Sequence, residues 1–351
     1  MQELKVTANE AGQRLDKLLT KYLNQAGKGF LYKMMRKKNI TLNGKKCEGA
    51  ERLNEGDVIR LFLADETISK FSRSAAVPSV SPCGSKSPSA LKNGTACGKK
   101  AEKGNGDREI RLDIIYEDSH ILIVNKPSGM LSQKAKDSDI SLNESIINYL
   151  IQSGRLSVEQ LRTFKPSICN RLDRNTSGLV TAGVSLAGLQ VMNRVFKDRS
   201  IHKYYQCLVK GEVKKKQLIT GFLKKNEASN KVEIHSQPTA GSMPIMTEYV
   251  PLKSNGRVTL LQVTLITGRS HQIRAHLASI GHPILGDFKY GDRRVNERVR
   301  SDYKITSQML HSFRLVMPEE LPEPLDHLNG KEFLAPLPGS FLRVMKGEGL
   351  T

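Results

Sequence analysis

One stretch of low complexity divides the chain into two parts that must fold separately. Between residues 69 and 107, 21 of 39 residues are Ser, Gly, Pro or Ala. The larger apolar residues of this stretch are Phe71, Val77, Val80 and Leu91. So few apolar side chains cannot offset the chain entropy that is lost on folding. We therefore predict a flexible basic linker at residues 66–108, between folded units at 1–65 and 109–351.

The chain carries a large excess of positive charge. Its 351 residues include 55 Lys and Arg against 35 Asp and Glu, which gives a formal charge of +20. This excess favours a polyanionic partner, because basic side chains that neutralise phosphates release counterions. Nucleic acid is the first candidate and an anionic membrane surface is the second. Aromatic residues make up 5% of the chain and Trp is absent, so base stacking must depend on a few Tyr and Phe residues.

Several classes of protein are disfavoured by what the sequence lacks. It has no run of 18 apolar residues and no basic-then-apolar start, so we expect a cytoplasmic protein without a membrane partner. The five cysteines form no CxxC pair, and their odd number argues against a full disulfide framework. We expect free thiols and assign no role to Cys83 or Cys97. Zinc-hydrolase, phosphate-loop and dinucleotide motifs are absent, so we predict no cofactor.

The first unit is predicted to be a small α+β module. Apolar residues recur at helical spacing over 13–26 and again over 30–38. A hairpin that turns at Asn43-Gly44 and a strand over 57–63 are expected to follow.

The second helix and the hairpin of this module share a basic surface. Between Lys28 and Lys46 there are seven Lys and Arg residues and no acidic residue. A charge run is often only a solvated helix face, but a run of one sign also suits the phosphates of RNA. The predicted RNA-binding residues here are Lys33, Arg36, Lys37 and Lys38.

The second unit mixes predicted strands and helices. Runs of apolar and β-branched residues predict strands over 112–126, 202–209 and 257–266. Apolar residues at helical spacing predict helices over 186–197 and 270–280. Ser141 and Glu144 form a capping box for a further helix, and Ser270 is the expected N-cap of the helix over 270–280.

A charge-dense loop lies between two apolar runs at residues 167–185. Asp173 is at its centre, between Arg171 and Arg174. A nearby guanidinium would keep the carboxylate ionised, as a carboxylate nucleophile must be. On spacing alone the simpler interpretation is a surface turn between two strands. The residues by themselves leave both interpretations open.

Two further places hold candidate site residues. Alternation along the strand over 202–209 puts Tyr204 and Tyr205 on opposite faces, so only one can point into a given site. Core packing is the usual role of a strand tyrosine. Donors for phosphates and base edges crowd the start of the helix over 270–280: Arg269, His271, Gln272, Arg274 and His276. The spacing of the histidines and the surrounding arginines argue against a metal.

Four motifs of the second unit resemble those of the RluA family of RNA pseudouridine synthases. RLDRNTSG resembles the family signature His-Arg-Leu-Asp-x-x-Thr-Ser-Gly, with Asn170 in place of the leading His. NKPSG resembles its Lys-Pro-x-Gly segment, and KYYQCLVKG resembles its Lys-x-Tyr strand. TGRSHQIRAH resembles Thr-Gly-Arg-Thr-His-Gln-Ile-Arg-Val-His. The resemblance covers about residues 112–345.

This resemblance implies roles for the candidate residues. Asp173 would be the catalytic residue, Arg274 its partner, and Tyr205 the residue that stacks on the target base. The implied RNA-binding residues are Arg171, Lys203, Arg269, His271 and Gln272. The implied fold is α+β, with a pseudouridine synthase catalytic domain built on a mixed, largely antiparallel sheet and with neither metal nor other cofactor. Whether Asp173 attacks the base or the sugar stays open.

The first unit has a resemblance of its own. Residues 13–63, with GQRLDKLL and ITLNGK, resemble the alpha-L RNA-binding domain, an S-four-like module shared with a ribosomal small-subunit protein. Together the resemblances imply a monomeric enzyme of the RluC and RluD branch that isomerises specific uridines to pseudouridine. Ribosomal RNA of the large subunit is the first candidate substrate and transfer RNA the second. Two alternatives are a non-catalytic RNA-binding or ribosome-assembly factor and a phosphoester hydrolase, which would want metal-binding carboxylates.

Overall fold

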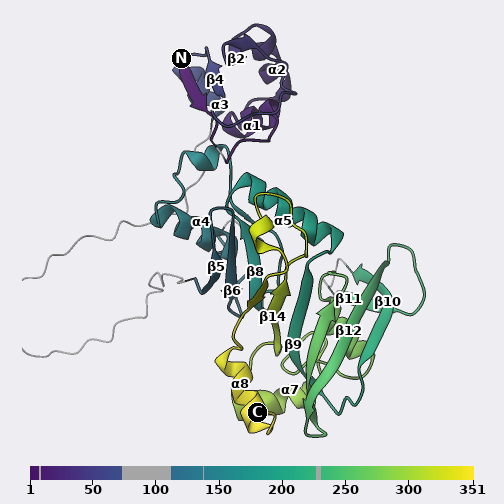
Figure 1. Cartoon of the computed structure of the whole chain (residues 1–351). Helices are drawn as coiled ribbons and strands as arrows, with labels where there is room; N and C mark the ends of the chain where they lie inside the picture. The colour runs from purple at the N-terminus through teal and green to yellow at the C-terminus, as the bar shows by residue number, and fades with distance from the viewer. Residues whose placement is uncertain (8, 73–111, 137, 227–230) are drawn as a thin grey trace, which may run out of the picture.

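The computed structural model describes residues 1–7, 9–72, 112–136, 138–226 and 231–351 (Figure 1). These residues form two separate sheets, and the smaller sheet has a hydrophobic core of its own. From residue 73 onward the predicted linker lies outside the described residues, as do Cys83 and Cys97. In the described part of the chain, no helix combines the length and the apolar content that crossing a membrane requires.

The N-terminal unit is an α+β module with the strand order β1-β4-β2-β3. Its elements are β1 (Gln2–Lys5), α1 (Leu15–Tyr22), α2 (Lys28–Arg36), β2 (Ile40–Leu42), β3 (Lys45–Lys46), β4 (Val58–Leu61) and α3 (Asp65–Phe71). The predicted hairpin turn is confirmed. Asn43 and Gly44 have φ angles of 51° and 75°, which is the left-handed geometry that a two-residue turn of this kind needs.

Residues 66–71, which the sequence assigned to the linker, belong instead to the N-terminal unit. They form most of α3, whose Ile68 is buried in the core of the module. The ring of Phe71 lies 4.6 Å from the ring of Phe30, and the Phe71 carbonyl accepts the Gln25 backbone N–H at 2.9 Å. The boundary is therefore corrected to follow Phe71. A helix of two turns with two apolar anchors is too short to show a periodic pattern.

The second unit is built on an 11-stranded sheet with the order β11-β10-β12-β13-β9-β14-β8-β6-β5, to which β15 adds beside β14 and β7 beside β8. Its strands are β5 (Ile114–Glu117), β6 (Ile121–Lys126), β7 (Ser167–Ile168), β8 (Ser177–Gly183), β9 (His202–Lys210), β10 (Gln217–Asn226), β11 (Lys231–His235), β12 (Met243–Ser254), β13 (Val258–Leu265), β14 (Leu310–Val316) and β15 (Glu332–Leu334). Among the described strands only β8 and β14 pair in parallel, so the predicted α+β class and the mixed, largely antiparallel sheet are confirmed.

Helices cover parts of this sheet, and α5 packs on β8 (Figure 1). The helices are α4 (Leu142–Gln152), α5 (Leu186–Asp198), α6 (Gln272–Ser279), α7 (Arg293–Tyr303) and α8 (Gly339–Gly347), with short 3-10 turns at Gln160–Arg162 and Asp326–Leu328. Ser141 is the N-cap of α4 as predicted, but its hydroxyl donates to the Glu144 carboxylate and makes no bond to the helix backbone. The two side chains therefore bond to each other, and the side-chain-to-backbone bonds that define the expected capping box are not found in the described structure.

The two units touch at the 3-10 turn that precedes β7. The hydroxyl of Thr163 donates to the Glu10 carboxylate at 2.5 Å. The guanidinium of Arg162 lies 4.0 Å from the centre of the Tyr22 ring, a cation–π contact. These contacts join the N-terminal module to the part of the second unit that leads into the Asp173 loop.

A close approach between two strands positions that loop, which runs from β7 to β8 as predicted. Gly178 in β8 has a φ angle of 114°, and a Cβ atom there would lie 2.2 Å from the Ser312 carbonyl oxygen in β14. Only glycine fits this contact, because it has no Cβ and tolerates positive φ. The first residues of β8, which follow the loop directly, are thereby held against β14.

Candidate active site

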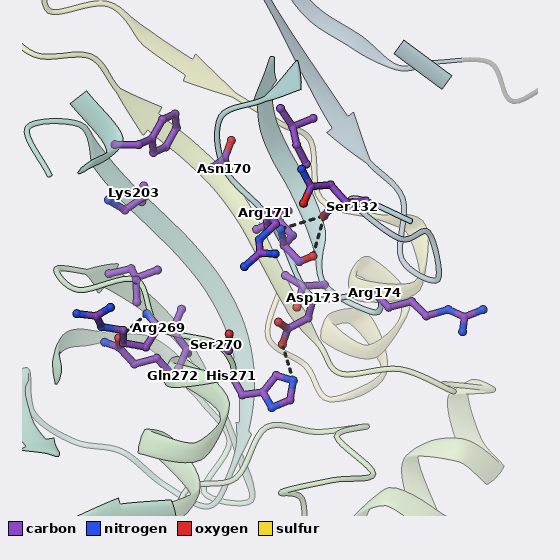
Figure 2. A pocket seen from close by; sticks show the side chains of 18 of the residues that line it. Ser132, Asn170, Arg171, Asp173, Arg174, Lys203, Arg269, Ser270, His271 and Gln272 are labelled. Carbon is purple, nitrogen blue, oxygen red and sulfur yellow. Dashed lines mark hydrogen bonds and ion pairs between the residues drawn. The ribbon is translucent and has the colours of Figure 1, made fainter. Parts of the chain in front are cut away.

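A cavity of about 950 Å³ opens in the second unit (Figure 2). It lies where residues 131–135, the Asp173 loop, the segment from the end of α5 into β9, and the start of α6 meet. Nine Lys and Arg side chains line the cavity, and Asp173 is the one carboxylate among the described lining residues. The cations are Lys134, Arg171, Arg174, Lys197, Arg199, Lys203, Lys225, Arg269 and Arg274. Walls of one sign focus the field and concentrate a polyanion at the cavity.

Hydrogen bonds on both sides of Asp173 fix its loop. The Ser132 hydroxyl donates to the Leu172 carbonyl at 2.8 Å and accepts the Leu172 N–H at 3.1 Å. The Gly129 N–H donates to the Arg174 carbonyl at 2.9 Å, and Arg174 Nε donates to the Gly129 carbonyl at 3.1 Å. The Asp173 side chain keeps 26% of its surface exposed. The loop therefore presents a preorganised carboxylate to the cavity.

Lys126 is a second anchor of the loop, and it was not among the predicted site residues. Its side chain is fully buried, and Nζ donates to the carbonyls of Pro127 at 2.9 Å, Met130 at 2.9 Å and Arg174 at 3.1 Å. Burial lowers the pKa of Lys126 to about 7, while the charge of Asp173 acts in the opposite direction. The sequence did contain a signal for this role, because Lys126 ends an apolar strand directly before Pro-Ser-Gly.

Asn170, which replaces the usual His of the motif, is a structural residue of the loop. Its side-chain amide donates to the Leu179 carbonyl at 3.2 Å and accepts the Thr181 N–H at 2.8 Å. Both bonds run to β8. Asn170 thus ties the entry of the loop to the strand that follows the loop.

Arg274 joins Asp173 to a second carboxylate. Arg274 Nη1 donates to Asp173 Oδ2 at 2.7 Å, while Nε and Nη2 donate to Asp287 Oδ2 and Oδ1 at 2.7 and 2.9 Å. Burial alone would lower the pKa of Arg274, but the hydrogen bonds and charges of Asp287 and Asp173 outweigh it and raise that pKa. The guanidinium therefore stays charged and is held from both sides. The structure brings Asp173 and Arg274 together, as the resemblance implied.

Asp287 is the partner that sequence reasoning missed. Its residue surface is fully buried. Burial acts to raise its pKa, but the hydrogen bonds and charge of Arg274 and the backbone N–H groups of Lys289 and Tyr290 prevail and lower it. A buried carboxylate with these donors remains ionised. Its place in the segment LGDFKYGD, thirteen residues after Arg274, carries no periodic signal.

Tyr205 lines the cavity from β9, on the face opposite Tyr204. It is 6% exposed, and burial raises its pKa to about 12, with the Asp173 charge acting in the same direction. Tyr204 instead lies against the guanidinium of Arg314, whose carbon is 4.7 Å from the ring centre. The two tyrosines thus lie on opposite faces of β9, as predicted.

The start of α6 differs from the prediction. The N-cap is His271, in the left-handed conformation with φ 56° and ψ 12°, and not Ser270. This conformation turns the His271 ring toward the site, where Nδ1 lies 2.9 Å from the Tyr290 hydroxyl and Nε2 lies 4.0 Å from Asp173 Oδ2. Burial lowers the pKa of His271, although the Asp173 charge acts in the opposite direction.

Gln272 and His276 are structural, which corrects their predicted place among the groups that contact RNA. Gln272 is 2% exposed. Its amide oxygen accepts from the Arg269 N–H and the Thr267 hydroxyl, and its amide nitrogen donates to the Met246 carbonyl and the Thr247 hydroxyl. His276 is also buried, with Nδ1 3.0 Å from the same Thr247 hydroxyl. Every polar atom of the Gln272 amide is occupied, so this side chain stabilises the turn before α6.

The other predicted RNA-binding residues divide into two groups. Arg171 is exposed on the cavity wall, Lys203 is buried in it, and Arg269 lines it with an Nε atom that has no hydrogen-bond partner among the described residues. Lys33, Arg36, Lys37 and Lys38 lie outside the cavity, exposed at the C-terminal end of α2 and directly after it.

Comparison with known proteins shows what the chain is similar to. Residues 120–279 match the family described as RNA pseudouridylate synthase. The chain is 29% identical to ribosomal large subunit pseudouridine synthase C of Vibrio vulnificus over 300 residues, and 28% identical to the protein of that name from Escherichia coli over 305 residues. Both matches cover 84% of this chain and 81% of the relative. The structure of human RNA pseudouridylate synthase domain containing 4 shares the fold, with a TM-score of 0.53 at 19% identity over 67% of this chain and 92% of that one. The chain is thus similar to RNA pseudouridine synthases over most of its length, and it matches the RNA pseudouridylate synthase family at residues 120–279.

Proposed function

We propose that this pseudouridine synthase acts on uridines of large-subunit ribosomal RNA and that Asp173 is its nucleophile. The names of the relatives from Vibrio vulnificus and Escherichia coli support the substrate. The strongly cationic cavity supports an RNA of any class, so transfer RNA is the second candidate. We also propose that the protein is a monomer and that it works in the cytoplasm, where ribosomal RNA is found.

The single observation that carries the catalytic part is the Asp173–Arg274 pair. It places a carboxylate, paired with a guanidinium 2.7 Å away, in a cavity whose described lining holds nine Lys and Arg side chains and no other carboxylate. A carboxylate held in this way is a suitable nucleophile for an RNA chain that the surrounding cations bind. A protein that only bound RNA would gain nothing from a buried charge cluster behind this carboxylate.

In the proposed reaction a uridine is flipped out of its stack into the cavity. The bond between uracil N1 and ribose C1′ breaks, the base rotates, and a bond forms between C5 and C1′. The C5 proton is released and N1 takes up a proton, so the reaction is an isomerisation without redox change. Asp173 supplies the nucleophilic carboxylate, Arg274 orients it, and the ring of Tyr205 packs on the uracil.

The N-terminal module is proposed to hold RNA outside the cavity. Its exposed basic residues at the end of α2 suit phosphate contacts, which position a substrate without reading its sequence. The proposed division of the chain is a module ending near Phe71 and a catalytic domain that starts near Leu112. The hydrogen bond from Thr163 to Glu10 is a contact between these two parts.

The test of the nucleophile is Asp173→Asn. The amide keeps the size of the side chain but has no nucleophilic charge, so single-turnover formation of pseudouridine should be abolished while RNA affinity stays nearly unchanged. Asp302→Asn is the matched control, because Asp302 is exposed on α7 and does not line the cavity. An Asp173→Asn enzyme with near-normal single-turnover activity would refute the proposed mechanism.

The substrate is tested separately by mapping pseudouridine in ribosomal and transfer RNA of cells with and without the gene. Loss of specific large-subunit sites is expected. Loss confined to transfer RNA would overturn the substrate and leave the chemistry intact, whereas no loss at all would favour a protein that binds RNA without modifying it.

A further inference from the structure

Lys203 is a buried cation with no anionic partner among the described residues. It lies in β9, is 8% exposed, and lines the cavity on the same face of the strand as Tyr205. Its Nζ donates to the Ile201 carbonyl at 3.3 Å, and no carboxylate of the described chain lies within ion-pair distance of it. Figure 2 shows Lys203 clearly apart from Asp173, the one carboxylate of the described cavity lining. Its charge is therefore not part of the Asp173–Arg274 cluster.

A second cation lines the same cavity, and its charge acts on Lys203. Arg199 also lines the cavity, at the C-terminal end of α5, with a left-handed φ of 66°. Glycine is the usual residue at such a position, because a side chain there is strained. Burial lowers the pKa of Lys203, and the charge of Arg199 lowers it further. Lys203, which is buried, thus carries its charge at the same wall of the cavity as the exposed Arg199, and an anionic ligand there would be attracted by both.

We infer that Lys203 and Arg199 form a subsite for one RNA backbone phosphate, next to the uridine that packs on Tyr205. The inference rests on the proposed function, because Tyr205 marks the position of the target base. An ammonium and a guanidinium only donate hydrogen bonds, so their ligand must be an acceptor, and an anionic phosphate also neutralises the paired charges. Two residues along a strand are about 7 Å apart, which places the Lys203 subsite roughly one nucleotide from the base.

The test measures binding and not isomerisation, so it does not depend on whether Asp173 is the nucleophile. The probe is a short single-stranded RNA with one central uridine, in which one phosphate at a time is replaced by an uncharged methylphosphonate. Its affinity is measured for the wild-type protein, for Lys203→Gln and for Lys214→Gln. Lys214 is the matched control, because its side chain is 74% exposed and it does not line the cavity.

One phosphate beside the uridine should stand out. Its replacement should weaken binding to the wild type and to Lys214→Gln about tenfold or more, because a charge-assisted hydrogen bond is removed. The same replacement should have no further effect on Lys203→Gln, which should already bind the unmodified RNA more weakly. If every replacement weakened binding to all three proteins by the same factor, the subsite would not exist.

The stability of the free protein provides an independent test. An unpaired buried cation destabilises the fold, so Lys203→Gln should unfold at the same or a higher denaturant concentration than the wild type. Lys203→Met, which keeps the length of the apolar stem, should behave alike. If both variants unfolded at clearly lower denaturant, Lys203 would be a packing residue and the inference would be wrong. Loss of activity in Asp173→Asn together with such a result would reject the subsite and keep the proposed function.

Discussion

Replacing Arg274 by lysine should separate catalysis from RNA binding, because one ammonium cannot do the work of this guanidinium. Arg274 uses Nε and Nη2 for Asp287 and Nη1 for Asp173, at 2.7 to 2.9 Å. Lysine keeps the charge but has a single nitrogen and no planar fork. Asp287 is fully buried, whereas the Asp173 side chain is 26% exposed. An unpaired Asp287 would be the more costly of the two, so the ammonium should pair with Asp287 and leave Asp173 without its partner.

The size of the effect follows from the hydrogen bond to Asp173 that lysine cannot make. A hydrogen bond to a charged group contributes about 1.5–3 kcal/mol. If Arg274 holds Asp173 in the transition state, the single-turnover rate at saturating enzyme should fall roughly tenfold to a hundredfold. RNA affinity should change much less, because Nε and Nη2 of Arg274 are already engaged by Asp287. The assay is pseudouridine formation over time, with affinity measured on the same RNA.

Arg269→Lys is the control for this substitution. Arg269 also lines the cavity, but it forms no ion pair with a carboxylate of the described chain, and a phosphate contact tolerates a point charge. Its rate should therefore stay close to that of the wild type. If the two lysine variants were equally mild in rate, or if Arg274→Lys reduced affinity in proportion to rate, the orienting role of Arg274 would be refuted.

Two further predictions concern other parts of the chain. Removing residues 1–72 should weaken RNA binding. The slope of log Kd against log salt concentration should fall by about 0.7 for each phosphate that the module neutralises. An unchanged slope in a binding titration would show that the basic surface of α2 is only solvated. Burial lowers the pKa of His311 to about 4, against about 6.5 in the unfolded chain, so the unfolded state binds more protons between these values. The free energy of unfolding should fall by up to about 3 kcal/mol as pH drops from 6.5 to 4, and urea titrations of His311→Gln should show a smaller fall. Equal pH dependence in the two proteins would contradict a neutral buried His311.

The sequence predicted what depends on neighbouring residues or on a motif. The Asp173 loop was expected because a polar stretch interrupts two apolar runs, and β7 and β8 bound it as expected. The pairing of Arg274 with Asp173 was implied by the RluA resemblance and could not follow from spacing, because 101 residues separate the two. The turn at Asn43-Gly44 was expected because these residues favour positive φ.

What the sequence did not show depends on contacts between distant segments or on a single backbone angle. Asp287 is recognisable only once α6 brings Arg274 against it. The N-cap at Ser270 was wrong because His271 takes the left-handed conformation, which residue type alone does not favour. The Gln272 amide could donate to RNA by its residue type, but in the fold its nitrogen donates to the Met246 carbonyl and the Thr247 hydroxyl of β12. The parallel pairing of β8 with β14 also joins segments far apart in the chain.

The shared guanidinium makes the cavity an electrostatic filter. Arg274 forms ion pairs with two carboxylates, Asp173 and Asp287. The cluster of these three side chains therefore has one net negative charge. The remaining lining cations surround this cluster. A phosphate is therefore attracted to the walls and repelled from Asp173, whereas an uncharged uracil can approach it without electrostatic penalty. The charge pattern therefore favours the flipped, uncharged base over the charged backbone next to Asp173, whatever the sequence of the RNA.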